Sequence, residues 1–474
     1  MRLAAWTRGG WYNFRREIGE RCVRHGPSVT GSSPPTVRKA IVLAAGSSTR
    51  MFSVSQGRSK AMLRLGGLTL LERCIRTLRT LHLDEIIVVA GHDGAAVGRL
   101  AASLRDPSVA VVEAPHWKDG NGRSLEAAEP RVCDDELFLL VTVDHVFEPT
   151  ALRDLVAARV PAVLVDRAPS PAELDEGTKV VLDDDRVVAF GKHLRSSAID
   201  CGAFVLTPNV FEAHRSALRD GDGSLAAAVS IFATSTPLHA VDVAPGTWTD
   251  VDVPEDLRSA RRRLRRSLGK EGDGPISRSL NRPISTRISM ALVRFPVSPD
   301  LVSVVVAIAG VVAAGLLAGG YGIAGGIAVQ AVSVLDGVDG EIARLRLKAS
   351  ARGAMVDGML DRVVDAAVIG GLGVWAGGSS DPTATIWLVV AALAGAMLSM
   401  ASKDRARLLG LRAAPEVWIG RLLGGRDGRM MVIALAAILE RPLLGLGVVA
   451  ATSLLSVAIR TASVLREPTA NAEP

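Results

Sequence analysis

Four aspartates in the second half of the chain stand at spacings that could build a metal site. Asp336 and Asp339 lie three residues apart, and Asp357 and Asp361 lie four residues apart, so on helices each pair shares one face. Both pairs lie in or beside long apolar stretches, where a carboxylate is costly and normally faces a polar cavity. Converging carboxylates bind hard divalent cations, and two such ions could neutralise a pyrophosphate during a displacement reaction. The alternative is that these acids only pair with nearby arginines.

A second group of candidate residues lies in the first half of the chain. A loop of small residues at 43–51 follows an apolar run, and such a loop can present its backbone N–H groups to phosphates. Arg50 and Lys60 could neutralise a triphosphate as pyrophosphate leaves. Asp144 ends a predicted strand, where a carboxylate can reach a ligand in the crevice beside a sheet. These residues predict a nucleotide site, in which the neighbouring His145 is given no catalytic role.

The elements that must position this second group alternate between short apolar runs and amphipathic segments. A helix is predicted at 68–81, and strands are predicted at 39–45, 85–90, 109–113 and 137–143. This alternation predicts an α/β head of Rossmann-like class with a mostly parallel, doubly wound sheet. The head is expected at residues 38–268, after a disordered leader at 1–37 and before a linker at 269–281.

The second half of the chain is dominated by apolar stretches, the longest of which has no charge from Leu301 to Leu335. Its length exceeds the roughly 20 residues that cross a bilayer once, and a glycine-rich break at 319–322 divides it into a hairpin. Further spans are predicted at 354–377, 382–402, 430–439 and 443–464. An all-α membrane domain of about six transmembrane helices is therefore expected at 282–466, followed by a disordered tail at 467–474.

The net charge of +6 comes from basic residues beside these spans, and aromatic residues make up only 4% of the chain. This pattern disfavours nucleic-acid binding. The positive-inside rule places the head and both termini in the cytoplasm, with the spans in the inner or plasma membrane. Lys403, Arg405 and Arg407 could hold a phosphorylated acceptor or could equally anchor the helix. Other loops expected on this side carry Arg344, Arg346, Lys348, Arg352, Arg412, Arg421, Arg426 and Arg429.

The stretch Asp336-Gly-Val-Asp-Gly-Glu-Ile-Ala-Arg344, followed by Gly353, Asp357 and Asp361, resembles the signature of CDP-alcohol phosphotransferases at every fixed position and spacing. The resemblance implies that all four aspartates bind Mg²⁺ or Mn²⁺ and that Asp361 also acts as the base toward the attacking hydroxyl. A homodimer through the membrane domain is a further expectation. The resemblance also implies that the CDP moiety is bound by Gly340, Ala343, Arg344 and Gly353.

The loop at 43–51, with Lys60 downstream, resembles the nucleotide-binding loop of sugar-phosphate nucleotidyltransferases. The resemblance implies catalytic roles for Arg50 and Lys60 and makes Asp144 and Asp252 the ligands of the catalytic Mg²⁺. That family often has glycine where Ser48 stands, which leaves the choice of base open. Segments 60–73, 119–125, 178–180, 191–192 and 200–204 resemble inositol-1-phosphate cytidylyltransferases more closely. Nucleotide contacts are expected from Leu43, Ala44, Ala45, Gly46, Arg50 and Lys60.

Within those segments, Lys179 is the candidate for the phosphate of the sugar or inositol, with an ordinary surface lysine as the alternative. The order of the two domains resembles the bifunctional inositol-1-phosphate cytidylyltransferase/di-myo-inositol phosphate phosphate synthase family over residues 38–465. That resemblance implies that the head converts CTP and inositol 1-phosphate to CDP-inositol and pyrophosphate. The membrane domain would then transfer the inositol-phosphate group to an alcohol and release CMP.

The acceptor alcohol implied by this resemblance is a second inositol 1-phosphate. A lipid or another polyol, as in phospholipid biosynthesis, and another phosphorylated alcohol in place of inositol phosphate both stay open. A membrane transporter or scaffold is disfavoured because all eight positions of the phosphotransferase signature are present. Fusion of the two domains would keep the activated intermediate close to the site that consumes it.

Overall fold

The computed structural model describes residues 36–47, 49–133, 136–269, 273–378, 380–408 and 425–466. The predicted tail, nearly all of the predicted leader and residues 270–272 of the predicted linker lie outside these ranges, as do Ser48, Arg412 and Arg421. The chain divides into two compact units after Arg263. Each unit has a hydrophobic core of its own.

The first unit is built on a mixed sheet, for which the described residues supply nine strands in the order β5-β4-β1-β6-β11-β8-β12-β10-β9. The four predicted strands are confirmed, and β1 (Lys39–Ala44), β4 (Glu85–Ala90), β5 (Val109–Glu113) and β6 (Phe138–Thr142) run parallel. The expectation of a mostly parallel sheet is wrong beyond β6. There β11 (Ile199–Leu206) runs antiparallel between β6 and β8 (Ala162–Asp166).

One antiparallel pair of this half of the sheet follows from a short connection. A tight turn joins β9 (Lys179–Asp183) to β10 (Arg186–Gly191), and the two pair as a hairpin. A connection this short cannot return the chain for parallel pairing, which requires a crossover. The last strand, β12 (His239–Asp242), pairs in parallel with β8 and in antiparallel with β10.

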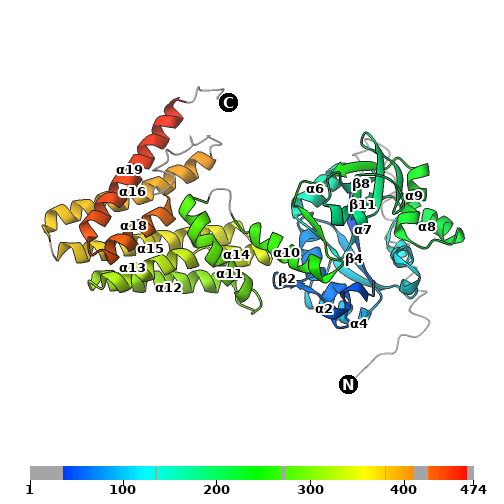
Figure 1. Ribbon diagram of the computed structural model, residues 1–474, viewed down its shortest axis with the longest axis horizontal. Coiled ribbons are helices and arrows are strands. Elements are labelled where there is room, and N and C mark those ends of the chain that lie inside the picture. Colours follow the sequence, from blue (N-terminus) through cyan, green and yellow to red (C-terminus); the bar gives the residue numbers. More distant parts are fainter. Residues whose placement is uncertain are drawn as a thin grey trace, which may run out of the picture. The chain divides into compact units, whose positions relative to one another are not determined.

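Helices cover both faces of this sheet, as Figure 1 shows. Ile41 and Ile87 join one core cluster with side chains from α5 (Asn121–Glu126), α8 (Asn209–Arg219) and α9 (Leu225–Ser235). Their neighbours Val42 and Val88 are equally buried on the opposite face, and continuous burial on both faces is characteristic of a doubly wound sheet. The predicted helix at 68–81 is confirmed as α3 (Leu70–Arg79), which Thr69 caps. The remaining longer helices are α4 (Gly94–Ser103), α6 (Pro149–Ala157), α7 (Pro171–Glu176) and α10 (Pro254–Arg266).

A small antiparallel sheet beside the main one brings together two distant segments. Its strands are β7 (His145–Phe147) and β13 (Trp248–Asp250), and their register sets His145 opposite Asp250. Just outside the pairing, the Val251 N–H donates to the carbonyl oxygen of Asp144 at 3.1 Å. The residues that follow β6 and β13 are therefore held at one end of the sheet.

The second unit is helical, and Figure 1 shows its longer helices lying side by side. They are α12 (Pro299–Ala318), α13 (Gly322–Leu335), α15 (Ala351–Gly377), α16 (Pro382–Leu408), α18 (Arg426–Ile438) and α19 (Pro442–Arg466). Two shorter helices are α11 (Arg282–Leu292) and α14 (Val338–Leu345). In the described part of the chain, four helical segments are long and apolar enough to cross a membrane: 299–318, 322–345, 382–406 and 442–465. The chain is therefore a membrane protein, while a count of six crossings stays a prediction.

Glycines bring these helices into close contact. A Cβ at Gly371 of α15 would overlap the backbone oxygen of Ala314 on α12, and one at Gly326 of α13 would lie 2.6 Å from the backbone oxygen of Ala434 on α18. Small residues at such contacts allow helix backbones to approach in a membrane. This packing fixes α15 and the end of α13, which carry the predicted metal ligands.

Candidate active sites

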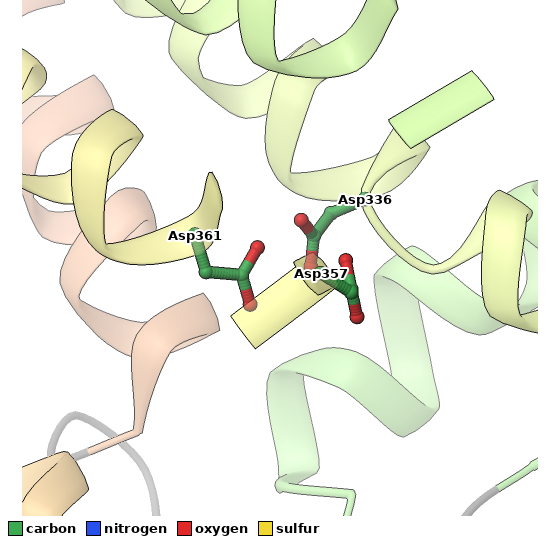
Figure 2. A group of neighbouring side chains, drawn as sticks. All are labelled: Asp336, Asp357 and Asp361. Carbon is green, nitrogen blue, oxygen red and sulfur yellow. The ribbon is translucent and has the colours of Figure 1, made fainter. Parts of the chain in front are cut away.

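Three of the four membrane aspartates converge, and together they form the one group of potential metal ligands found among the described residues. Asp336 follows the last residue of α13, and Asp357 and Asp361 lie one turn apart on α15. One carboxylate oxygen from each lies within 4.8 Å of the other two, and Figure 2 shows the three carboxylates pointing toward one another. This set of hard oxygen donors fits a divalent cation such as Mg²⁺.

Asp339 lines the same small cavity as these three residues but does not join the group. Residues 336–337 form a turn between α13 and α14, so Asp336 ends the first helix and Asp339 lies in the second, and both line the cavity. The Asp339 side chain is almost fully buried. Its carboxylate accepts hydrogen bonds from the Ser303 hydroxyl and from the Gly340 N–H, so it is engaged at the side of the cavity.

The arginine at the centre of this cavity is not one that the sequence pattern singles out. The Nη1 atom of Arg426 contacts Asp336 and lies 3.1 Å from Asp361. Its Nε atom lies 2.9 Å from Asp365, which also pairs with Arg429 at 2.9 Å. In the sequence Arg426 resembles any other basic residue at a membrane edge. The sequence feature that could have pointed to a buried arginine partner is Asp365, a further acid one turn beyond Asp361 on α15.

The four residues expected to bind CDP lie on the two helices that follow α13. Gly340, Ala343 and Arg344 lie on α14, where their spacing gives them one face, and Gly353 lies in the first turn of α15. Among the described atoms, a Cβ would meet nothing closer than 3.4 Å at Gly340 and 3.3 Å at Gly353. Internal packing therefore does not require glycine at these two positions. Arg344 donates from Nη2 to the Leu268 carbonyl at 2.9 Å.

The basic cluster proposed for an acceptor phosphate lies at the end of α16. Lys403 is half-buried and Arg405 is exposed, while the side chain of Arg407 lies outside the described part of the chain. The nearby Asp404 pairs with Arg362 of α15 at 3.0 Å. Neither of the two described basic residues is among the described residues that line the aspartate cavity.

The head contains a cavity of about 370 Å³ at the carboxyl ends of β1 and β6. Every nucleotide and metal residue predicted for the head lines it, whereas Lys179, predicted for the substrate phosphate, does not. The predicted residues are Leu43, Ala44, Ala45, Gly46, Arg50, Lys60, Asp144 and Asp252. Residues that the sequence did not single out also line it, among them Trp117, Lys118, Asn121 and Ser124.

A network of charges joins the two predicted metal ligands of the head. The ammonium group of Lys60 lies 3.2 Å from Asp144 and also contacts Asp252, and Arg50 lies 2.5 Å from Asp252. Burial opposes the charge of Lys60, yet Asp144 and Asp252 raise its pKa. Burial also opposes the charges of both aspartates, but the pKa of each is lowered, by Lys60 together with His145 at Asp144 and by Lys60 together with Arg50 at Asp252. Because one ammonium group touches both carboxylates, both lie within reach of a single cation.

Asp250 is not among the residues that line this cavity, whereas Asp252, two residues later, is. Its carboxylate lies 3.8 Å from Nε2 of His145, whose ring stacks on that of Trp248 with centroids 5.6 Å apart. Burial raises the pKa of Asp250 to about 6. Of the two acids in this segment, only Asp252 faces the cavity.

The structure does not bring Lys179 to the nucleotide cavity. The residue opens β9, and its ammonium group donates to the carbonyl oxygens of Asp175 at 3.1 Å and Gly177 at 3.0 Å. Those carbonyls end α7, where a lysine commonly satisfies free acceptors. Lys118 is a cavity-lining lysine that the sequence analysis missed, because a lysine beside a tryptophan has no distinctive pattern.

Comparisons with known proteins agree with the division of the chain into a head and a helical membrane domain. Residues 40–182 match the MobA-like NTP transferase domain, and residues 296–461 match the CDP-alcohol phosphatidyltransferase family. A "Bifunctional IPC transferase and DIPP synthase" of Rubrobacter xylanophilus is 39% identical over 85% of this chain and 91% of its own length. A protein of the same name from Thermococcus kodakarensis is 35% identical over 84% of this chain and 89% of its own length.

The membrane domain alone also resembles a shorter protein. A "Phosphatidylinositol phosphate synthase" of Mycobacteroides abscessus is 32% identical over 41% of this chain and 90% of its own length. The two family matches cover different units, and the long alignments run through both. The chain therefore belongs to the family of bifunctional IPC transferases and DIPP synthases, with a nucleotidyltransferase and a CDP-alcohol phosphotransferase domain on one polypeptide.

Proposed function

We propose that the head converts CTP and inositol 1-phosphate to CDP-inositol and pyrophosphate, and that the membrane domain transfers the inositol-phosphate group to a second inositol 1-phosphate and releases CMP. The observation that carries this proposal is the convergence of Asp336, Asp357 and Asp361 within a complete phosphotransferase signature. The same chain also contains the cavity lined by the predicted nucleotide residues of the head. The choice of inositol is supported by membership of the bifunctional family.

In the head, a phosphate oxygen of inositol 1-phosphate attacks the α-phosphorus of CTP, and pyrophosphate leaves. The loop after β1 binds the phosphates through its N–H groups, and Arg50 and Lys60 neutralise the charge of the leaving pyrophosphate. Asp144 and Asp252 would hold Mg²⁺ or Mn²⁺, which supplies further positive charge to the phosphates when bound. Lys60, released from those carboxylates, is then available to a phosphate oxygen.

In the membrane domain, the acceptor hydroxyl attacks the phosphorus that carries inositol, and CMP leaves. Asp361 accepts the hydroxyl proton as general base. With Asp336, Asp357 and Asp339 it would also hold one or two divalent cations, whose chemistry is to neutralise the pyrophosphate link. Gly340 and Gly353 leave space for the cytidine diphosphate to approach the helix backbones. Ala343 and Arg344 complete the proposed CDP contacts.

The proposed location follows from the charge pattern. Basic residues on the loops between helices support a topology of six crossings with the head and both termini at the cytoplasmic face of the inner or plasma membrane. Both sites then use the cytosolic pool of CTP and inositol 1-phosphate. A homodimer through the membrane domain is proposed from the family resemblance.

A lipid acceptor is the second candidate for the membrane step. The similarity of this domain to the Mycobacteroides abscessus protein named as a phosphatidylinositol phosphate synthase favours it. The site lies in a domain whose described helices include four long and apolar enough to cross a membrane, where lipids would be the neighbouring molecules. The two candidates share the head reaction and differ only in the alcohol that attacks.

The test incubates the purified full chain in detergent with CTP, inositol 1-phosphate and Mg²⁺ and follows pyrophosphate and CMP separately. Release of both products supports the complete sequence. Pyrophosphate without CMP supports the head reaction, and adding phospholipid vesicles then asks whether a lipid restores CMP release. Neither product would remove the inositol assignment.

A further inference from the structure

The aspartate cavity already contains a positive charge supplied by the chain itself. Four carboxylates line it together with the guanidinium group of Arg426. The contacts of Arg426 fall on two of the carboxylates proposed to bind a divalent cation, Asp336 and Asp361. A guanidinium group and a metal cation compete for the same carboxylate oxygens, and their like charges repel each other.

The guanidinium group of Arg426 makes two separate sets of contacts, one through Nη1 and one through Nε. Nη1 makes the contacts with Asp336 and Asp361, whereas Nε pairs with Asp365 at 2.9 Å. The Asp365 side chain is 0% exposed and is shared with Arg429, which is 1% exposed. A fully buried carboxylate paired with two arginines is a rigid anchor, because losing either partner would leave a charge uncompensated.

We propose that Arg426 is a built-in counter-ion that competes with a divalent cation for Asp336 and Asp361. Asp365 is its positioning residue: it retains the guanidinium group beside the site when a cation takes the place of Nη1. In the absence of a cation, Arg426 offsets the mutual repulsion of the aspartates. The inference rests on the proposed function only in requiring that these aspartates bind a divalent cation.

The test measures Mn²⁺ binding to the full chain in detergent by electron paramagnetic resonance. The membrane site is defined as the part of the binding that is lost in Asp361→Asn, which separates it from binding by the head. Arg426→Gln removes the competitor, so the membrane site should bind Mn²⁺ about tenfold more tightly, within the usual range of coupling between two ligands. Arg362→Gln is the matched control, since it removes a neighbouring charge on α15 that pairs with Asp404 instead.

The same variant should also change stability, because it removes the ion pairs of Arg426 and leaves buried carboxylates uncompensated. Without added metal, Arg426→Gln should unfold at a lower temperature than the wild type, and Mn²⁺ should raise its Tm by more. Arg426→Lys keeps the charge and the fold but cannot bridge Asp365 and Asp361 through a planar group. It should therefore bind Mn²⁺ with an affinity between those of the wild type and Arg426→Gln.

The outcomes separate the two levels of the proposal. If Asp361→Asn removes no Mn²⁺ binding, the metal site of the proposed function is wrong. If it removes binding but both Arg426 variants bind Mn²⁺ as the wild type does, or more weakly, the competition is wrong. An equal gain in affinity in Arg362→Gln would show a general effect of charge and would also overturn the inference.

Discussion

At the scale of single residues, Asp361 carries the membrane reaction in this proposal as both ligand and base. Asp361→Asn should abolish CMP release, by about 10²–10⁴-fold for the loss of the base alone, and should leave pyrophosphate release intact. Quantifying the two products separately from one incubation tests this. Asp300→Asn, an exposed aspartate in the first turn of α12, is the control and should retain both activities. Loss of both products in Asp361→Asn would argue against independent sites.

His214 is a second residue whose environment makes a prediction, here for the pH dependence of the head. Its ring is fully buried, and neither nitrogen has a hydrogen-bond partner in the described part of the chain. Burial lowers the pKa of His214. The unfolded chain, with a histidine pKa of about 6.5, then binds a proton before the folded chain does. The stability that depends on the neutral ring is therefore complete above that pH and is lost as the pH falls toward the lower folded value.

His214→Phe should remove this pH dependence, because phenylalanine fills a similar space and cannot bind a proton. The measurement is the Tm of the head transition at about pH 7.5 and about pH 5.5. The decrease in Tm on acidification should be smaller in His214→Phe than in the wild type. His239→Gln, which changes an exposed histidine of β12, should behave as the wild type does. An undiminished decrease in His214→Phe would assign the acid sensitivity to other groups.

At the scale of elements, the membrane site depends on how closely α12 and α15 pack. Gly371→Ala places a methyl group against the backbone oxygen of Ala314, whereas a Cβ at Gly370 meets nothing within 4 Å among the described atoms. Gly371→Ala should destabilise the domain by about 1–3 kcal/mol, as overpacking does, and should slow CMP release by displacing α15. Gly370→Ala adds the same methyl group to the same helix and should be neutral. Thermal unfolding and CMP release in both variants test this, and equal behaviour of the two would contradict close packing at Gly371.

At the scale of the whole molecule, we expect the head to release its CDP-alcohol product into solution before the membrane domain binds it. Lys60→Met should inactivate the head and Asp361→Asn the membrane domain, so neither variant alone should form CMP from CTP and inositol 1-phosphate. A mixture of the two should form CMP after a lag, while the intermediate made by one protein accumulates for the other. As a control, Lys60→Met supplied with CDP-inositol should release CMP without a lag. A mixture that stays inactive beside an active control would indicate direct transfer within one chain.

Much of this architecture could be predicted because it is local in the sequence. Strands β1, β4, β5 and β6 are continuous apolar runs, and the helices of the second unit are long apolar segments, so burial and backbone preference specify them without distant partners. The phosphotransferase signature spans only residues 336–361, and one turn of α15 is enough to set Asp357 and Asp361 on one face. Periodicity does not reveal the turn at 336–337, which leaves Asp336 at the end of α13 and Asp339 in α14.

The contacts that complete each site were decided by the tertiary structure alone. Pairing of β7 with β13 selects Asp252 rather than Asp250 to face Asp144, and the packing of α18 brings Arg426 to Asp361. Lys179 was a candidate ligand residue from its sequence, but in the fold its ammonium group donates to two backbone carbonyl groups instead. The sequence by itself determined the two domain classes and most of their candidate residues, because periodicity and short motifs act over a few turns of chain. It did not determine which distant charges meet, because an ion pair has no periodicity and forms only where the packing of the whole domain places its partners.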